Sequence, residues 1–117
     1  MLNQVVLVGR LTDNPEVQNL DEGKKLSSVT VAVQRTYKNS EGLYEADFIR
    51  CVLWNGIAAN TSEYCKKGDV VGVKGRIQSR SYEDKEGIKK YVTEVIAEKV
   101  TFLSSSKKDE VKELVSQ

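Results

Sequence analysis

The segment Asp47-Phe-Ile-Arg-Cys-Val-Leu-Trp54 alternates between two kinds of side chain and is the strongest sign of fold in the chain. Side chains along a β-strand point alternately to its two faces. One face carries Ile49, Cys51 and Leu53, an apolar set that suits a hydrophobic core. The other face carries Phe48, Arg50, Val52 and Trp54. The segment therefore predicts a strand with one face in the core and a second face of different chemistry.

This second face places a guanidinium between two large aromatic side chains. Nucleobases stack on aromatic rings and phosphates pair with arginine, so the arrangement favours binding of an unpaired nucleic acid strand. The alternative is a second packed face, as in a β-sandwich, with Arg50 in an internal ion pair. The segment by itself leaves both interpretations open.

A length of 117 residues indicates one domain with a single core. Met1 is followed at once by a strand-like run rather than by a basic and apolar leader. No window approaches the roughly 20 apolar residues that span a bilayer. We therefore expect a cytoplasmic, nucleoid-associated protein with no membrane contact, in which Cys51 and Cys65 are reduced thiols.

The composition argues against an enzyme. The chain has no histidine, the commonest general base and metal ligand. Its serines lack a nucleophile-elbow context, and Gly68, Gly72 and Gly75 have the spacing of neither phosphate-binding loop. Two cysteines without histidine make a poor metal site, and we expect them to be small buried hydrophobes. The sequence predicts no cofactor and no metal, although it leaves catalysis by carboxylates alone open.

Charge is unevenly distributed although the net charge is only +1. The ionised residues between Asp13 and Gly23 are all acidic, whereas residues 66–90 hold eight basic and four acidic side chains. A local field, rather than total charge, concentrates a polyanion in a groove. The second half of the chain is therefore the expected side of contact with nucleic acid.

Strand signals dominate the chain, and one helix interrupts them. Alternation and turn residues predict strands at 3–11, 27–37, 45–54, 70–82 and 90–100, with a helix over 57–67 that ends before Gly68. Three strands, a helix and two strands is the element order of the OB-fold, an all-β, five-stranded Greek-key barrel with one helix between strands 3 and 4. The predicted domain covers residues 1–103, and residues 104–117 form a short, polar, flexible tail.

Several ordered blocks carry a family resemblance. Asn3-Gln-Val-Val-Leu-Val-Gly-Arg-Leu11, Asn14-Pro-Glu-Val17 and the segment 47–55 come first, followed by Tyr64-Cys-Lys-Lys-Gly-Asp69 and Val73-Lys-Gly-Arg-Ile77. In order and spacing they resemble bacterial and phage single-stranded-DNA-binding proteins over residues 1–103. The resemblance implies sequence-tolerant binding and protection of single-stranded DNA in replication, recombination and repair.

The resemblance places the stacking aromatics on Tyr37, Phe48, Trp54 and Tyr82. The basic residues that we expect to contact DNA are Arg35, Lys38, Arg50, Lys67, Lys74, Arg76, Arg80 and Lys85. The remaining tyrosines, Tyr44, Tyr64 and Tyr91, are interpreted as structural, with Tyr64 packing the helix onto the barrel.

The resemblance also implies a homotetramer. Such proteins typically end in an acidic run with a terminal aromatic that recruits replication and repair enzymes. The ending Glu113-Leu-Val-Ser-Gln117 has neither feature, so we do not expect that recruitment. A short paralogue, phage-encoded or dedicated to DNA uptake, and an incomplete sequence both fit this ending. An RNA-binding or primosome-accessory OB module and a protein-interaction barrel remain as alternative functions.

Overall fold

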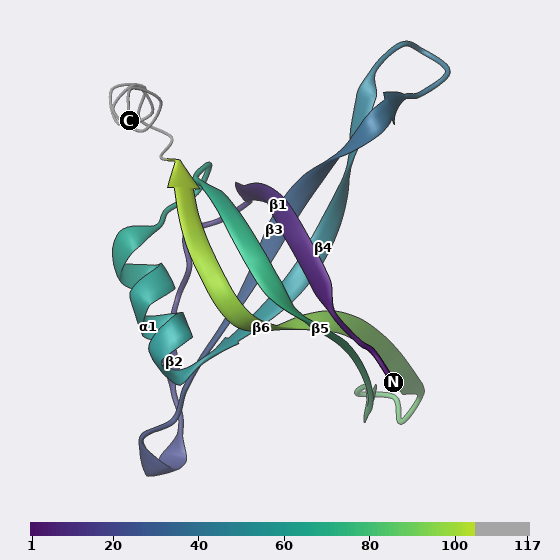
Figure 1. Cartoon of the computed structure of the whole chain (residues 1–117). Coiled ribbons are helices and arrows are strands. Elements are labelled where there is room, and N and C mark those ends of the chain that lie inside the picture. The colour runs from purple at the N-terminus through teal and green to yellow at the C-terminus, as the bar shows by residue number, and fades with distance from the viewer. Residues whose placement is uncertain (105–117) are drawn as a thin grey trace.

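The computed structural model describes residues 1–104, whose elements follow the predicted order (Figure 1). The long strands are β1 (Val5–Leu11), β3 (Lys25–Lys38), β4 (Tyr44–Trp54), β5 (Val70–Glu83) and β6 (Lys89–Ser104). The helix α1 (Asn55–Tyr64) lies between β4 and β5 and therefore between the third and fourth long strands, as predicted. A two-residue strand β2 (Gln18–Asn19) and the 3₁₀ turn η1 (Asp21–Gly23) fill the connection from β1 to β3.

The sheet closes on itself through β1. The strand order is β1-β5-β6-β4-β3-β2, and β1 also pairs with β3 at Arg10↔Ala32 and Leu11↔Val31. The pairing of β4 with β6 is parallel and short, at Cys51↔Val95 and Val52↔Ile96, whereas the other pairings within residues 1–104 are antiparallel. This closed five-stranded topology with one helix is the predicted OB-fold.

The core fills the barrel from the inward faces of its strands. Its fully buried side chains include Val31, Cys51, Leu53, Ala58, Val71 and Val73. Two glycines allow the strands to approach closely. A Cβ on Gly9 would overlap the carbonyl oxygen of Ala32, and one on Gly75 would overlap that of Ile96. The register of β5 against β6 shifts between Lys74 and Gly75, which is the local irregularity of a β-bulge.

The helix differs from the prediction at its C-terminal end. It ends at Tyr64, and the backbone N–H of Cys65 donates to the Thr61 carbonyl at 3.0 Å. The Lys66–Asp69 segment then turns, with Gly68 at a φ of 92°. Tyr64 is 65% exposed, yet its ring centre lies 6.1 Å from that of Phe102 on β6, so the predicted contact of the helix with the barrel through Tyr64 is present at the edge. Thr61, which is 1% exposed, lies deeper in the same interface.

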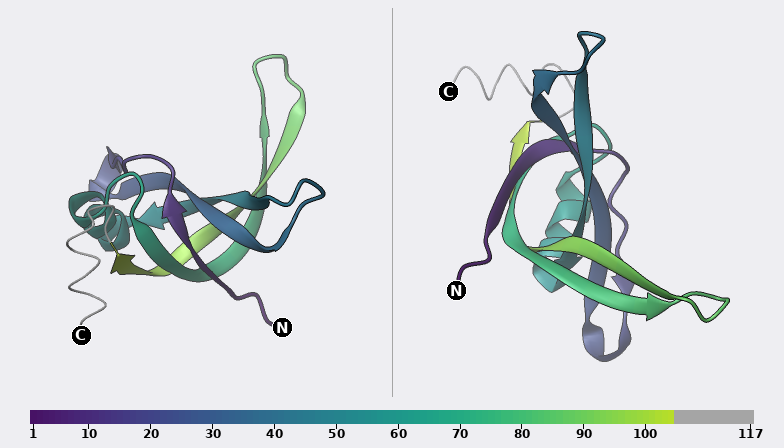
Figure 2. Two further views of the ribbon diagram at one scale, coloured as in Figure 1. Left: turned by 90° about the horizontal axis from the view of Figure 1, so that it is seen from above. Right: turned by 90° about the vertical axis from the view of Figure 1, so that its right-hand side faces the viewer.

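Two hairpins extend beyond the barrel and diverge in the three ribbon views (Figures 1 and 2). One joins β3 to β4, and the other joins β5 to β6. Ile77 is 48% exposed because it lies where β5 leaves the barrel. The Asn3 side chain forms two hydrogen bonds with the Ile77 backbone. It accepts from the Ile77 N–H at 2.9 Å and donates to the Ile77 carbonyl at 2.7 Å.

Ser104, the first residue of the predicted tail, is the last residue of β6. The rest of that tail, residues 105–117, lies outside the described residues. Among the residues that are described, no helix is long and apolar enough to cross a membrane.

Candidate nucleic-acid interface

Strand β4 presents the two faces that its alternation predicts. Cys51 and Leu53 are completely buried, whereas Phe48 on the opposite face is 67% exposed and Trp54 is 39% exposed. The Arg50 side chain between them is half exposed. Val52 belongs to the same outer face, as predicted, but is buried at 6%. Val52 lies where β4 is paired on both sides, with β3 and with β6.

A row of polar and basic side chains continues this surface on β5. Lys74, Arg76, Arg80 and Tyr82 are exposed and share one face by alternation. The guanidinium carbon of Arg80 lies 5.9 Å from the ring centre of Tyr82, within the range of a cation–π contact. Arg76 donates to the side-chain oxygen of Gln78 at 2.9 Å. The strand therefore offers an aromatic ring with a cation beside it.

The two strands are joined by Glu94 on β6. Its carboxylate is 3% exposed and lies 3.2 Å from Nε of Arg50 and 2.9 Å from Nε of Arg80. Arg50 is thus half exposed and also ion-paired, as the packed-face interpretation expected, while its contact with nucleic acid stays a prediction. Phe48, Arg50, Trp54, Arg80 and Tyr82 are named here the aromatic–arginine face.

Glu94 was not predicted from the sequence. It stands in the predicted strand 90–100 between Thr93 and Val95, and its neighbourhood is otherwise apolar. A buried carboxylate on a strand between two others requires a cation as a partner. This requirement could have identified Glu94 from the sequence. The identity of the cations depends on the register of β4 and β5 against β6, which the sequence does not reveal.

The β3–β4 hairpin holds a second cluster around Arg35. This guanidinium lies 2.7 Å from an oxygen of Asp47 and 2.9 Å from one of Glu45. The hydrogen bond from Arg35 and its charge lower the pKa of Asp47, and the same pair raises the pKa of Arg35. Arg35 is thus paired with two half-exposed carboxylates, and its contact with DNA stays a prediction.

The other predicted contact residues are scattered. Tyr37 is 63% exposed on the β3–β4 hairpin, where Nζ of Lys38 lies 5.6 Å from the ring centre of Tyr44. Lys85 lies in the turn of the β5–β6 hairpin. Lys67 follows the end of α1 that is remote from Trp54, so the structure does not bring it to the aromatic–arginine face. The tyrosines interpreted as structural are also exposed, Tyr44 by 52% and Tyr91 by 74%.

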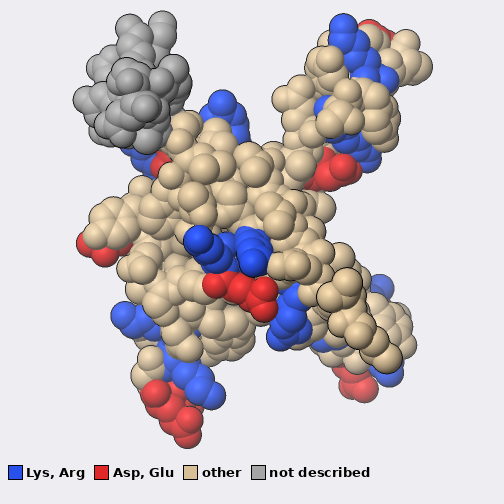
Figure 3. Space-filling model, in the orientation of Figure 1, with Lys and Arg blue, Asp and Glu red and all other residues tan. Residues whose placement is uncertain are grey.

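Basic and acidic side chains are interspersed on the side of the molecule seen in Figure 3, with neutral surface between them. Both cysteines are buried as expected, and burial raises the pKa of each thiol to about 11. They are therefore protonated at neutral pH and poor nucleophiles. Within residues 1–104 no group of three or more His, Cys, Asp or Glu residues is placed to hold a metal ion.

These features define an OB-fold barrel with an exposed face of aromatic and arginine side chains. Comparison with known proteins gives the family. The model of the single-strand binding protein family matches residues 2–103, and the chain belongs to this family. Membership agrees with the expectation that the chain is a binding protein and not an enzyme.

Three similar proteins are bacterial single-stranded DNA-binding proteins. Over 103 residues the chain is 52% identical to the single-stranded DNA-binding protein B of Bacillus subtilis, covering 88% of this chain and 91% of that protein. It is 50% identical over 105 residues to the single-stranded DNA-binding protein 3 of Listeria innocua, with 90% and 66% covered. It is also 52% identical over 103 residues to the single-stranded DNA-binding protein of Halalkalibacterium halodurans, with 88% and 61% covered. The match thus spans less than two thirds of the length of the last two relatives.

The Arg35–Asp47 pair gives a prediction for acid titration. The folded pKa of Asp47 is lowered, so the pair stabilises the fold at neutral pH, and this contribution is lost as the pH falls through that lowered pKa. In Arg35→Gln the pKa of Asp47 should rise toward its ordinary value of about 3.9. NMR titration of the Asp47 carboxyl carbon measures this change. Arg50→Gln serves as the control, because Arg50 pairs with Glu94, and an unshifted Asp47 in Arg35→Gln would contradict the assignment.

Proposed function

We propose that the chain binds single-stranded DNA without strong sequence preference and protects it during replication, recombination and repair. The observation that carries the proposal is the exposure of Phe48 and Trp54 on either side of Arg50 in β4. Exposing large aromatic side chains to water is unfavourable unless a ligand covers them, and every nucleobase offers a flat face for stacking. Membership in the single-strand binding protein family supports the same ligand.

In the proposed mechanism, aromatic rings bind the bases and cationic side chains bind the phosphates. Bases stack on Phe48, Trp54 and Tyr82, while Arg50 and Arg80 contact the phosphates between them. Lys74 and Arg76 extend the positive row along β5. Stacking depends little on base identity, and phosphate contacts do not depend on it, which accounts for tolerance of sequence.

Two alternatives make different demands on the same surface. An RNA-binding OB module would need groups that recognise the 2′-hydroxyl, and it would bind oligo-rU at least as tightly as oligo-dT. A protein-interaction barrel would bind neither oligomer. Titrating both oligomers of equal length against the chain distinguishes all three functions.

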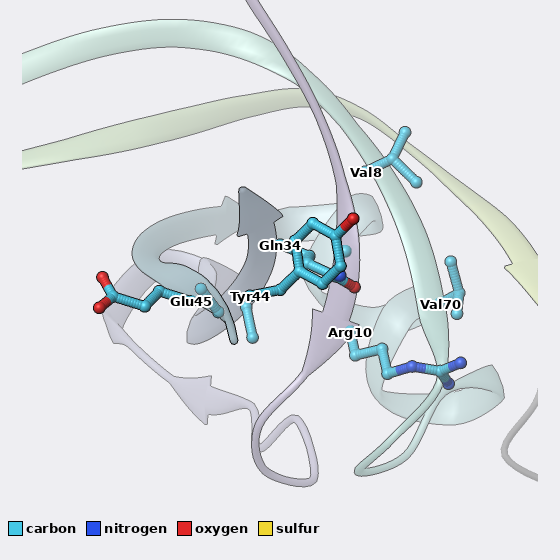
Figure 4. A pocket seen from close by; sticks show the side chains of 9 residues that line it. Val8, Arg10, Gln34, Tyr44, Glu45 and Val70 are labelled. Atoms are coloured by element: carbon cyan, nitrogen blue, oxygen red, sulfur yellow. The ribbon is translucent and has the colours of Figure 1, made fainter. Parts of the chain in front are cut away.

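We further propose that four barrels assemble, as the family resemblance implies, in the cytoplasm. Residues 5–9 of β1 pair with β5 on one side only, and Val6 and Val8 on the outer face are 67% and 53% exposed. Beside this strand lies a groove of about 520 Å³ between β1 and the β3–β4 hairpin. Val8, Val70 and the Tyr44 ring line it (Figure 4). An unpaired strand edge with exposed valines beside a groove favours pairing with a second copy.

The first prediction concerns stacking on Trp54, the only tryptophan. Binding of oligo-dT should strongly quench its fluorescence, because a base stacked directly on the indole ring quenches the excited state. Trp54→Ala should weaken binding by about 1–3 kcal/mol, measured by the anisotropy of labelled oligo-dT. The matched control is Tyr64→Ala, which removes an exposed ring on α1 and should leave the affinity unchanged. Unquenched emission at saturating DNA would refute this placement of the ligand.

The second prediction concerns assembly. Sedimentation equilibrium should return about four times the chain mass of 13.1 kDa, because four copies cover the exposed outer faces of their β1 strands. Val8→Lys places a charge on that face and should lower the measured mass. A monomer mass for the unaltered chain at micromolar concentration would reject the proposed tetramer.

A further inference from the structure

We propose that Glu94 is a positioning residue for DNA binding, which holds Arg50 and Arg80 at a fixed separation on the aromatic–arginine face. This inference rests on the proposed function of the face. It adds a role for a carboxylate, a group that ordinarily repels DNA.

The strand order makes this arrangement possible. Strand β6 lies between β5 and β4, so a side chain on its outer face is flanked by outer-face side chains of both neighbours. Glu94 is directly paired with Gln78 on β5, and the adjacent Val95 is paired with Cys51 on β4. Arg50 and Arg80 therefore approach Glu94 from opposite sides.

The ion pairs use one part of each guanidinium. One carboxylate oxygen of Glu94 lies beside Nε of Arg50, and the other lies beside Nε of Arg80. This geometry leaves the terminal amino groups for other partners. One terminal amino group of Arg50 donates to the Ser28 hydroxyl at 3.2 Å, and those of Arg80 have no hydrogen-bond partner within residues 1–104. The two arginine side chains are 48% and 44% exposed, so phosphate can reach them.

The charges explain why a buried carboxylate helps here. Two guanidinium groups held close together repel each other, and the carboxylate between them offsets this repulsion. Glu94 is itself 3% exposed and lies beneath the arginines, so an approaching phosphate meets the cations first. Because two arginines share one carboxylate, the cluster remains net positive. Side chains already held in the bound geometry lose less conformational entropy when the ligand binds.

The cluster also lies beside the stacking surface. Phe48, Arg50 and Glu94 line one pocket of about 210 Å³ together with Ile77 and Thr93. The Tyr82 ring on β5 contacts the guanidinium of Arg80. Glu94 therefore links the arginine beside the β4 rings, Arg50, to the arginine beside the β5 ring, Arg80.

The proposal is tested by whether Glu94→Gln strengthens or weakens binding of oligo-dT. Glu94→Gln keeps the shape of the side chain and makes the net charge more positive. If Glu94 merely repelled DNA, the variant would bind oligo-dT more tightly. If Glu94 positions the arginines, binding should weaken about tenfold despite the added positive charge. The slope of log affinity against log salt should also become shallower by about 0.7 for each phosphate that the arginines no longer neutralise.

Glu98→Gln is the matched control, with the same change of charge on the same strand. Glu98 is exposed and lines a pocket beside α1, away from the aromatic–arginine face. The affinity of this variant should equal that of the unaltered chain or exceed it slightly. A Glu94→Gln variant that binds as tightly as Glu98→Gln, with an unchanged salt slope, would overturn the proposal.

Arg80→Lys decides the question if Glu94→Gln does not fold, as judged by circular dichroism. Lysine keeps the charge, but its single ammonium cannot pair with the Glu94 carboxylate and contact phosphate at the same time, as a guanidinium can. We expect affinity about tenfold weaker, whereas unaltered affinity would overturn the positioning role. Failure of the unaltered chain to bind oligo-dT would instead reject the proposed function itself.

Discussion

Strand β4 must satisfy two environments at once, and the proposed binding surface depends on that constraint. Its odd-numbered residues Cys51 and Leu53 are fully buried in the barrel. The strict alternation of a strand then forces Phe48, Arg50 and Trp54 to the outside. A shift of one residue would move the rings into the core and the core residues into water. The burial of the inner face therefore fixes the position of the aromatic face.

Barrel closure extends this arrangement to residues that are remote in sequence. Strand β1 pairs with both β5 and β3, and the short parallel pairing of β4 with β6 brings Glu94 between Arg50 and Arg80. The β3–β4 hairpin differs, because Arg35 is paired there with Asp47 and Glu45.

The local sequence patterns predicted the features that depend on neighbouring residues along the chain. Alternation predicted the strands and the outward position of Phe48 and Trp54, and the turn residues predicted the boundaries to within a few positions. The features that alternation did not predict lie where distant segments meet. Val52 on the outer face is buried where β4 is paired on both sides, and Ile77 is exposed because β5 leaves the barrel there. The partners of Arg35 and Arg50 depend on strand register, so the sequence did not reveal them.

The central claim, that exposed rings on β4 bind the DNA, is tested most directly by a backbone and side-chain NMR titration of the chain with oligo-dT. We expect the largest shifts on the aromatic–arginine face, at Phe48 and Trp54 of β4 and at Tyr82 of β5. We expect little change at Tyr64 and Phe102, whose rings are 6.1 Å apart on the α1 side. Large shifts at Tyr64 and Phe102, with β4 unaffected, would contradict the claim.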